Sequence, residues 1–203
     1  GLTAEKVHAQ ADTPKTLATG DTAVIGAGTQ VKADTVAICG HLTIDGGALL
    51  ETSTSTSAWN IGVVYVQGSS TDNASIVVQN GGTLATVVGG NIVAGHEVGT
   101  FGTITVTGKG SVVSSSFLQP GNYGSGTINI LDGANAVATT VVMANYAGSV
   151  GVTNVSGAGS TLLAGTLYMN GDGHGTMNVS DGAKVFVFQK TRFGADGGYY
   201  GEL

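Results

Sequence analysis

One nine-residue stretch decides the fold of this chain. Residues Gly126–Ala134 read Gly-Thr-Ile-Asn-Ile-Leu-Asp-Gly-Ala, and residues Gly175–Ala183 read Gly-Thr-Met-Asn-Val-Ser-Asp-Gly-Ala. In each copy, two apolar residues flank a polar one and precede a glycine-containing turn. Looser copies of the pattern occur at Leu42–Leu49, Ile76–Leu84, Ile104–Val112 and Thr153–Ser160. Self-similarity of this kind indicates a repeat architecture.

The spacing of the copies shows how regular the repeat is. The second apolar residue of each copy serves as a marker, and the markers are Ile44, Val78, Val106, Ile130, Val155 and Val179. They are separated by 34, 28, 24, 25 and 24 residues. The repeat is therefore regular from about residue 75 to about residue 190, and irregular up to about residue 75 because of insertions. The polar stretch Thr52–Ser57 is expected to be a loop within the first insertion.

A short strand cannot bury a face alone, so repeats of this length stack on one another. The sequence predicts an all-β fold, a right-handed parallel β-helix (a solenoid) with coils of about 24 residues. The handedness follows from the general rule for crossovers between parallel strands. The markers should form a buried column. Because side chains alternate between the faces of a strand, the preceding residues should point outward and form mostly polar ladders: Thr43, Val77, Thr105, Asn129, Asn154 and Asn178.

The ends of the chain are expected to differ from the repeats. Residues 1–20 should form an N-terminal cap or flank, with a short helix at Thr3–Gln10, and residues 21–203 should form the β-helix. Phe186–Phe188 continue the strand pattern, and Arg192–Gly201 are expected to form one more glycine-rich corner. An open end of the stack exposes unpaired strand edges. We therefore expect the β-helix to continue in a longer protein.

Composition excludes two classes of partner. Only 10% of the residues are charged, the net charge is −6, and Lys109 is the one cation between Lys32 and Lys184. Nucleic-acid binding needs a basic surface, so no nucleic-acid partner is expected. No apolar run approaches the ~18 residues of a membrane-spanning helix, so this segment is not expected to insert into a membrane. Cys39 is the single cysteine, which excludes an internal disulfide and is typical of a small buried apolar residue.

The repeated segments resemble those of autotransporter passenger domains, which type V secretion exports, and the related PEP-CTERM-associated repeats. The resemblance rests on Gly126–Ala134, Gly175–Ala183 and Val155–Leu162, and it extends well over residues 75–190 and loosely over residues 20–75. It implies a secreted or cell-surface fragment of a passenger, displayed at the outer membrane of a bacterium. Passengers of this architecture include adhesins, aggregation factors, proteases and esterases, so the architecture does not fix the activity.

Enzymatic and metal-binding patterns are weak in this sequence. The Gly-Xaa-Ser-Xaa-Gly pattern of a nucleophilic serine is absent. Asp45, Asp132 and Asp181 fall in the same turn of the repeat, but an aspartate before glycine is ordinary turn chemistry. Gly171–Gly175 resembles a calcium-binding repeat only once, whereas that architecture needs many copies. His96 and Glu97 lack further ligands at metal spacing. The sequence therefore predicts no catalytic, cofactor or metal site.

Aromatic residues form the one candidate contact surface. Phe101, Tyr123, Tyr146, Tyr199 and Tyr200 all lie near glycine-rich corners. Stacked along one edge, Phe101, Tyr123, Tyr146 and Tyr200 could contact a glycan or a protein. The alternative is that they only shield the corner backbone and pack on each other.

These observations leave several functions open. The first is adhesion, through a glycan or protein of a host or bacterial surface. The second is aggregation through self-association, and the third is service as a structural stalk. The rival is a polysaccharide-active β-helix enzyme, a lyase or glycoside hydrolase, which would need two carboxylates about 5 to 9 Å apart in a groove.

Overall fold

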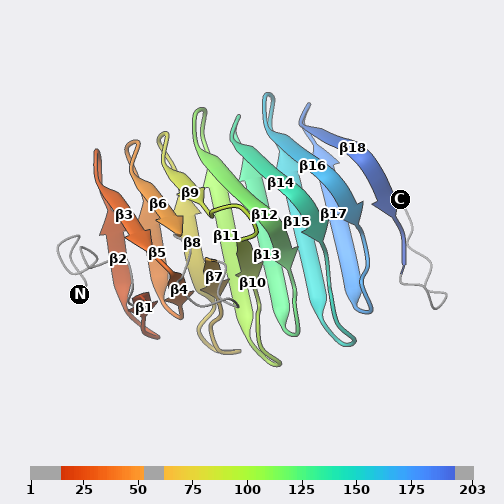
Figure 1. Cartoon of the computed structure of the whole chain (residues 1–203), viewed down its shortest axis with the longest axis horizontal. Helices are drawn as coiled ribbons and strands as arrows, with labels where there is room; N and C mark the ends of the chain where they lie inside the picture. The colour runs from red at the N-terminus through yellow and green to blue at the C-terminus, as the bar shows by residue number, and fades with distance from the viewer. Residues whose placement is uncertain (1–14, 53–61, 195–203) are drawn as a thin grey trace.

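The computed structural model describes residues 15–52 and 62–194 and shows a parallel β-solenoid of seven turns (Figure 1). Each turn contributes one strand to a seven-stranded sheet, here called the ladder sheet. In spatial order its strands are β2 (Thr22–Ile25), β5 (His41–Ile44), β8 (Ala74–Val78), β11 (Phe101–Thr107), β13 (Ser125–Leu131), β15 (Val150–Ser156) and β17 (His174–Ser180). Within the described ranges there is no helix long and apolar enough to cross a membrane.

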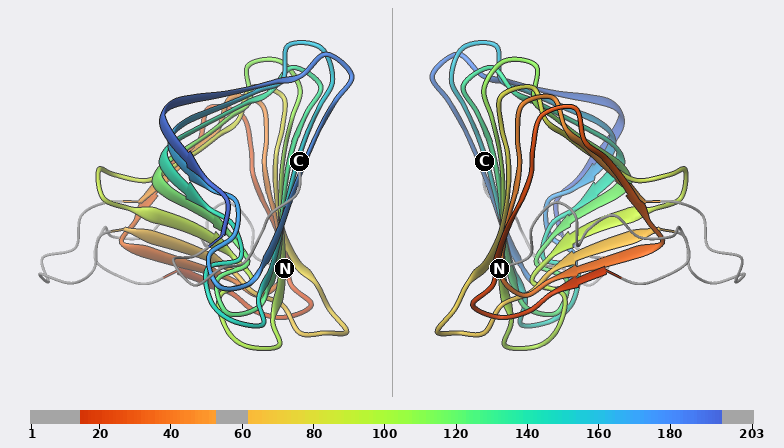
Figure 2. Two further views of the ribbon diagram at one scale, coloured as in Figure 1. Left: turned by 90° about the vertical axis from the view of Figure 1, so that its right-hand side faces the viewer. Right: turned by 90° about the vertical axis from the view of Figure 1, so that its left-hand side faces the viewer.

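The remaining strands form a second, eleven-stranded sheet that covers the other two sides of the prism (Figure 2). One side begins with β1 (Lys15–Leu17), β4 (Thr35–Ile38), β7 (Val63–Val66) and β10 (Asn91–Ala94). The other begins with β3 (Gln30–Ala33), β6 (Leu49–Thr52) and β9 (Thr83–Ala85). The long strands β12 (Val112–Pro120), β14 (Asn135–Val142), β16 (Thr161–Tyr168) and β18 (Lys184–Arg192) then span both sides.

The chain winds as a right-handed helix. Seen from its N-terminal end, it rises along the ladder sheet, crosses the top and descends on the other side, turning clockwise as it recedes (Figure 2). Every strand-to-strand register between neighbouring turns is parallel. This winding confirms the expected right-handed solenoid. It is also the crossover that the twist of parallel strands favours.

The six marker residues form one column inside the prism. The strand registers pair Ile44 with Val78, Val78 with Val106, Val106 with Ile130, Ile130 with Val155, and Val155 with Val179. The first five are fully buried, whereas Val179 is 48% exposed because β17 is the last strand of the ladder sheet. The predicted inner column is thus confirmed. Val179 is exposed because no further described strand of the ladder sheet follows β17.

The outward residues form the expected ladder in the C-terminal half. Asn129 donates to Thr105 Oγ1 (3.1 Å), Asn154 donates to Asn129 Oδ1 (2.8 Å), and Asn178 donates to Asn154 Oδ1 (2.8 Å). Each bond joins one coil to the coil before it. Asparagine recurs here because its amide can donate in one direction along the ladder and accept in the other.

A column of glycines sets the corner where each coil enters the ladder sheet. Gly102, Gly126, Gly151 and Gly175 lie side by side in register. A Cβ atom on Gly126 would lie 2.1 Å from the Ala94 carbonyl oxygen and 2.3 Å from the Gly121 nitrogen. Glycine is therefore required at this position because any side chain would collide with neighbouring backbone atoms. The backbone conformation itself does not demand glycine here.

The irregular intervals have two sources in the structure. The registers of β6 with β9 and of β7 with β10 show that one insertion lies between β6 and β7, where residues 53–61 are outside the described ranges. A second insertion lies between β9 and β10, where Asn91 follows Ala85 by six residues although their register partners Ser114 and Phe117 on β12 are three residues apart. Thr52, expected in the loop, is instead the buried last residue of β6, because its side chain faces the interior.

Several expectations fall partly or wholly outside the described residues. These are the helix at Thr3–Gln10, the remainder of the Thr52–Ser57 loop, and the end of the Arg192–Gly201 corner. β1 at Lys15–Leu17 already pairs with β4, so solenoid pairing is present within the segment expected as a flank. Cys39 is a free thiol of intermediate burial, and burial raises its pKa, followed in effect by the charge of Glu97.

Candidate binding edge

Two tyrosines stack on one edge of the prism, in the corner loops that lead into the ladder sheet. The rings of Tyr123 and Tyr146 lie 4.0 Å apart at an angle of 2°, and the two residues are 43% and 41% exposed. Successive coils bring them together, because the Tyr123 nitrogen donates to His96 O and the Tyr146 nitrogen donates to Asn122 O. We call these two residues the tyrosine pair.

A row of polar side chains runs beside the tyrosine pair. Asn145 donates to Asn122 Oδ1 at 3.0 Å, and Asn122 Nδ2 lies 3.1 Å from His96 Nδ1. The His96 ring lies 4.1 Å from the Tyr65 ring. Burial lowers the pKa of His96, against the opposing effect of Glu97. A neutral imidazole can accept at Nδ1, so this row of three residues, the amide row, is a continuous hydrogen-bonded chain.

The amide row leads into a hollow near the last coil. The hollow is lined by Val142, Asn145, Tyr168, Asn170, Gly171, Asp172, Arg192 and Gly194. Asp172 takes the next position after the tyrosine pair, since its nitrogen donates to Asn145 O. Lys190 Nζ lies 5.6 Å from the centre of the Tyr168 ring. The hollow therefore combines a carboxylate, a guanidinium, two amides and an aromatic ring.

Of the four aromatic residues predicted as a contact surface, the structure brings two together. Phe101 is partly exposed, but it lies at the start of β11 in register with Ser125, Val150 and His174 rather than with the tyrosine pair. It is held by an antiparallel bridge to Gly68. Tyr200, like Tyr199, lies outside the described residues. Tyr168 and Arg192 were not predicted as site residues, and Asp172 was considered only within the Gly171–Gly175 pattern.

The turn carboxylates are held by neighbouring side chains. Asp132 accepts from Thr107 (2.9 Å), and Asp45 accepts from Asn80 (2.7 Å). Asp181 accepts from Ser156 (2.7 Å) and Ser180 (2.9 Å), and these bonds lower its pKa. Gly157 occupies the coil between Asp132 and Asp181, so the two carboxylates are roughly 10 Å apart. A carboxylate that accepts hydrogen bonds from neighbouring side chains on an exposed turn suits a structural role better than acid catalysis.

The outer face of the ladder sheet offers a second surface, which is flat and polar. Its rows consist mostly of hydroxyl and amide side chains, and in the last four coils they are Thr103, Thr127, Val152 and Thr176, and Thr105, Asn129, Asn154 and Asn178. None of these is ionisable. In the described part of the chain no group of three or more His, Cys, Asp or Glu residues is arranged to hold a metal ion.

Comparison with known proteins found no matching family model, no matching curated protein and no matching solved structure.

Proposed function

We propose that this chain is part of an exported bacterial passenger, a β-helical rod that holds an uncharged glycan at the cell surface and so acts in adhesion. The observation that carries the proposal is the tyrosine pair, whose stacked rings stand exposed beside the amide row. The resemblance of the repeats to autotransporter passengers supports the export and the surface location.

The chemistry of the edge favours a sugar over other ligands. Aromatic rings provide a flat apolar surface for the C–H face of a sugar, and the partly exposed amide of Asn145 can bond its hydroxyl groups. Asn122 is buried and holds Asn145 and His96 in place. A net charge of −6 disfavours a strongly anionic polymer. A single such contact is weak, but many copies on one surface would bind together with much higher avidity. The rod would thus act through repetition rather than through one deep pocket.

The test is adhesion of beads that carry the chain to glycan arrays and to bacterial cells. We expect the wild-type beads to bind a subset of neutral glycans, and Tyr123→Ala with Tyr146→Ala to reduce that binding at least ~tenfold. The matched control is Phe117→Ala, because Phe117 is similarly exposed but lies on β12. Absence of binding by the wild type, or equal losses in both variants, would overturn the proposal.

Polysaccharide cleavage is a second candidate, favoured by one observation. Asp172 and Arg192 line the same hollow, so a carboxylate and a cation lie where a sugar next to the tyrosine pair would reach. A general base beside a cation is a pairing that polysaccharide lyases need. Incubation with neutral and uronate polymers, followed by measurement of new reducing ends, tests it. Activity that Asp172→Asn abolishes would favour this candidate, and intact polymer would exclude it for those substrates.

A further inference from the structure

A serine, a histidine and an aspartate meet on the outer face of the ladder sheet. Ser75 lies on β8 and pairs in register with His41 on β5. Ser75 Oγ lies 2.8 Å from His41 Nδ1, and His41 Nε2 lies 3.5 Å from Asp72 Oδ1. The imidazole therefore stands between a hydroxyl and a carboxylate. We call these three residues the Ser–His–Asp cluster.

The cluster exists because two successive corners differ in length. The strand registers pair Ile38 with Val66 and His41 with Ser75. His41 follows Ile38 by three positions, whereas Ser75 follows Val66 by nine. The longer corner brings Asp72 back beside the His41 ring. No single sequence motif contains this contact, because it depends on the lengths of two loops.

The loop that carries Asp72 is held by hydrogen bonds of its own. Gly68 exchanges two backbone hydrogen bonds with Phe101, of 2.7 and 2.9 Å, which fix the start of the loop. The Asp72 nitrogen donates to Ser69 Oγ at 3.1 Å, within a tight turn. The carboxylate is thus placed next to the imidazole before any ligand arrives. Such preorganisation is what a group that orients a general base requires.

The hydrogen bonds of the cluster define the protonation state of the imidazole. When the Ser75 hydroxyl donates to His41 Nδ1, the ring proton resides on Nε2 and faces Asp72. A histidine in this state can remove a proton from serine while the aspartate stabilises the imidazolium. In the familiar serine proteases Nε2 faces the serine, but either nitrogen of a neutral imidazole can accept the proton.

Hydrogen-bond donors lie on the other side of Ser75. Thr103 on β11 pairs with Ser75 in register, opposite to His41. Asn73 Nδ2 donates to Thr103 Oγ1 at 3.0 Å, which leaves the Thr103 hydroxyl hydrogen and the second amide hydrogen of Asn73 to donate. Donors of this kind stabilise the oxyanion that forms when a carbonyl is attacked. The partly exposed Ser75 therefore has a base on one side and donors on the other.

From this arrangement we infer that the chain is a serine esterase, with Ser75 as nucleophile, His41 as general base and Asp72 as positioning residue. Ser75 Oγ attacks the ester carbonyl and gives its proton to His41. The oxyanion accepts hydrogen bonds from Thr103 and Asn73. The intermediate then expels the alcohol, which takes the proton from His41, and an acyl group remains on Ser75. Water attacks this acyl group and gives a proton to His41, the acid leaves, and Ser75 recovers its proton.

The surroundings of the cluster indicate the class of ester. The side chains of His41 and Asp72 are 45% and 33% exposed, so the site is open and can accept an ester carried on a large molecule. An open site buries little of an acyl chain and gains little affinity from a long one. The neighbours along the row, Thr103 and Thr127, are uncharged. The expected substrates are uncharged esters of short acyl groups, independent of glycan binding at the tyrosine pair.

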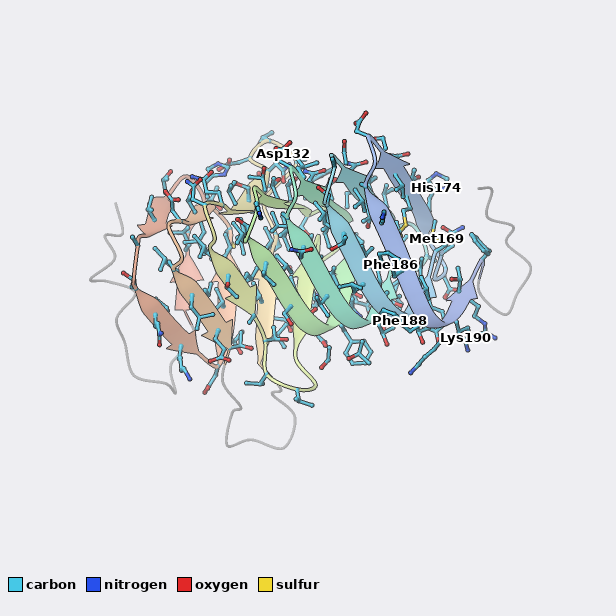
Figure 3. The ribbon with its side chains drawn as sticks, turned by 90° about the horizontal axis from the view of Figure 1, so that it is seen from above. Asp132, Met169, His174, Phe186, Phe188 and Lys190 are labelled. Carbon is cyan, nitrogen blue, oxygen red and sulfur yellow. The ribbon has the colours of Figure 1, made fainter. Side chains whose placement is uncertain are left out.

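Labelling of the full chain with a fluorophosphonate tests the nucleophile. The reagent forms an O–P bond to Ser75 Oγ and releases fluoride, while His41 takes the hydroxyl proton. We expect peptide mapping to find an adduct on Ser75 and none on Ser125, a serine of β13 whose neighbours in register carry no imidazole. His41→Gln should slow labelling at least ~tenfold. His174→Gln, on β17 near the C-terminal end of the solenoid (Figure 3), should not. An unlabelled Ser75, equal labelling of Ser125, or an unchanged rate in His41→Gln would overturn the inference.

Hydrolysis of p-nitrophenyl acetate separates catalysis from a merely structural hydrogen bond. We expect Ser75→Ala to abolish turnover above the spontaneous rate, and Ser125→Ala to leave it unchanged. Asp72→Asn should lower kcat at least ~tenfold with KM unchanged, and Asp72→Glu should restore part of the loss. A purely structural role would instead leave turnover as it is and lower only the unfolding temperature. Turnover that survives Ser75→Ala, or an unchanged kcat in Asp72→Asn, would contradict the assigned roles.

Discussion

The side-chain amide of Asn154 donates a 2.8 Å hydrogen bond to Asn129 on the coil before it and accepts an equal bond from Asn178 on the coil after it. Asn154 is therefore the middle of a ladder and Asn178 is its end. At this outward position, the side chain of one coil is hydrogen-bonded to the equivalent side chains of the coils before and after it. The same register places the tyrosine pair and the amide row on a single edge.

Replacing Asn154 with alanine should lower stability more than replacing Asn178. Asn154→Ala removes two ladder bonds, so that Asn129 is bonded only to Thr105 and Asn178 has no partner in the ladder. We expect a loss of about 1–2 kcal/mol. Asn178→Ala removes one bond at an exposed end, and we expect about half of that loss. Urea unfolding of dilute protein measures both. Equal losses would contradict a continuous ladder.

The buried hydroxyl of Thr153 is a weak point in the core. Its column partners in the neighbouring coils are Ile128 and Met177, and its Oγ1 has no hydrogen-bond partner. Thr153→Val removes the unpaired polar atom without changing the volume, so it should raise stability by about 1 kcal/mol. Thr127→Val, on the outer face of β13, is the control and should have little effect. A loss of stability in Thr153→Val would mean that the hydroxyl is satisfied.

Gly126 in the glycine column and Gly108 in the turn after β11 should respond very differently to substitution by alanine. Gly126→Ala would force a Cβ atom against two backbone atoms and should cost about 3 kcal/mol or more. Gly108→Ala meets no atom within 4 Å, although its φ is +83°, and should cost about 1 kcal/mol. Thermal unfolding of both variants measures the difference. Similar costs would show that the corner is looser than the structure indicates.

Stability should fall between neutral and mildly acidic pH because of His96. Burial holds the folded-state pKa of His96 below its ordinary value of 6.5, so the unfolded chain binds a proton first as the pH falls. Stability contributed by neutral His96 is thus present above pH 6.5 and is lost as the pH falls towards the lower folded pKa. His96→Gln should flatten this slope, whereas His174→Gln, on exposed β17, should not. A slope unchanged in His96→Gln would contradict this assignment.

The strand positions that repeat from coil to coil could be predicted from the sequence. The residues that individual corner loops bring together could not. Val106, Ile130 and Val155 could be aligned from the sequence alone, because alternation and constant spacing fix both face and register. Asp172 and Arg192 are twenty residues apart on different elements, and no periodic signal brings them into one hollow. Phe101 resembles the tyrosines in type and in its glycine neighbours, yet a corner of different length places it in another row. Loop lengths, rather than strand patterns, thus decide the candidate edge.

Because the candidate edge exists only if one register runs through the turns, cross-linking of adjacent coils tests the account most directly. In a Cys39→Ser background, Asn129→Cys with Asn154→Cys places two cysteines on neighbouring coils with their Cα atoms about 4.8 Å apart, within the range of a disulfide. Asn129→Cys with Asn178→Cys places them two coils apart, which is too far. Under mild oxidation of dilute protein, we predict a rapid intramolecular disulfide in the first pair and none in the second. Comparable cross-linking in both pairs, or in the second alone, would contradict the account.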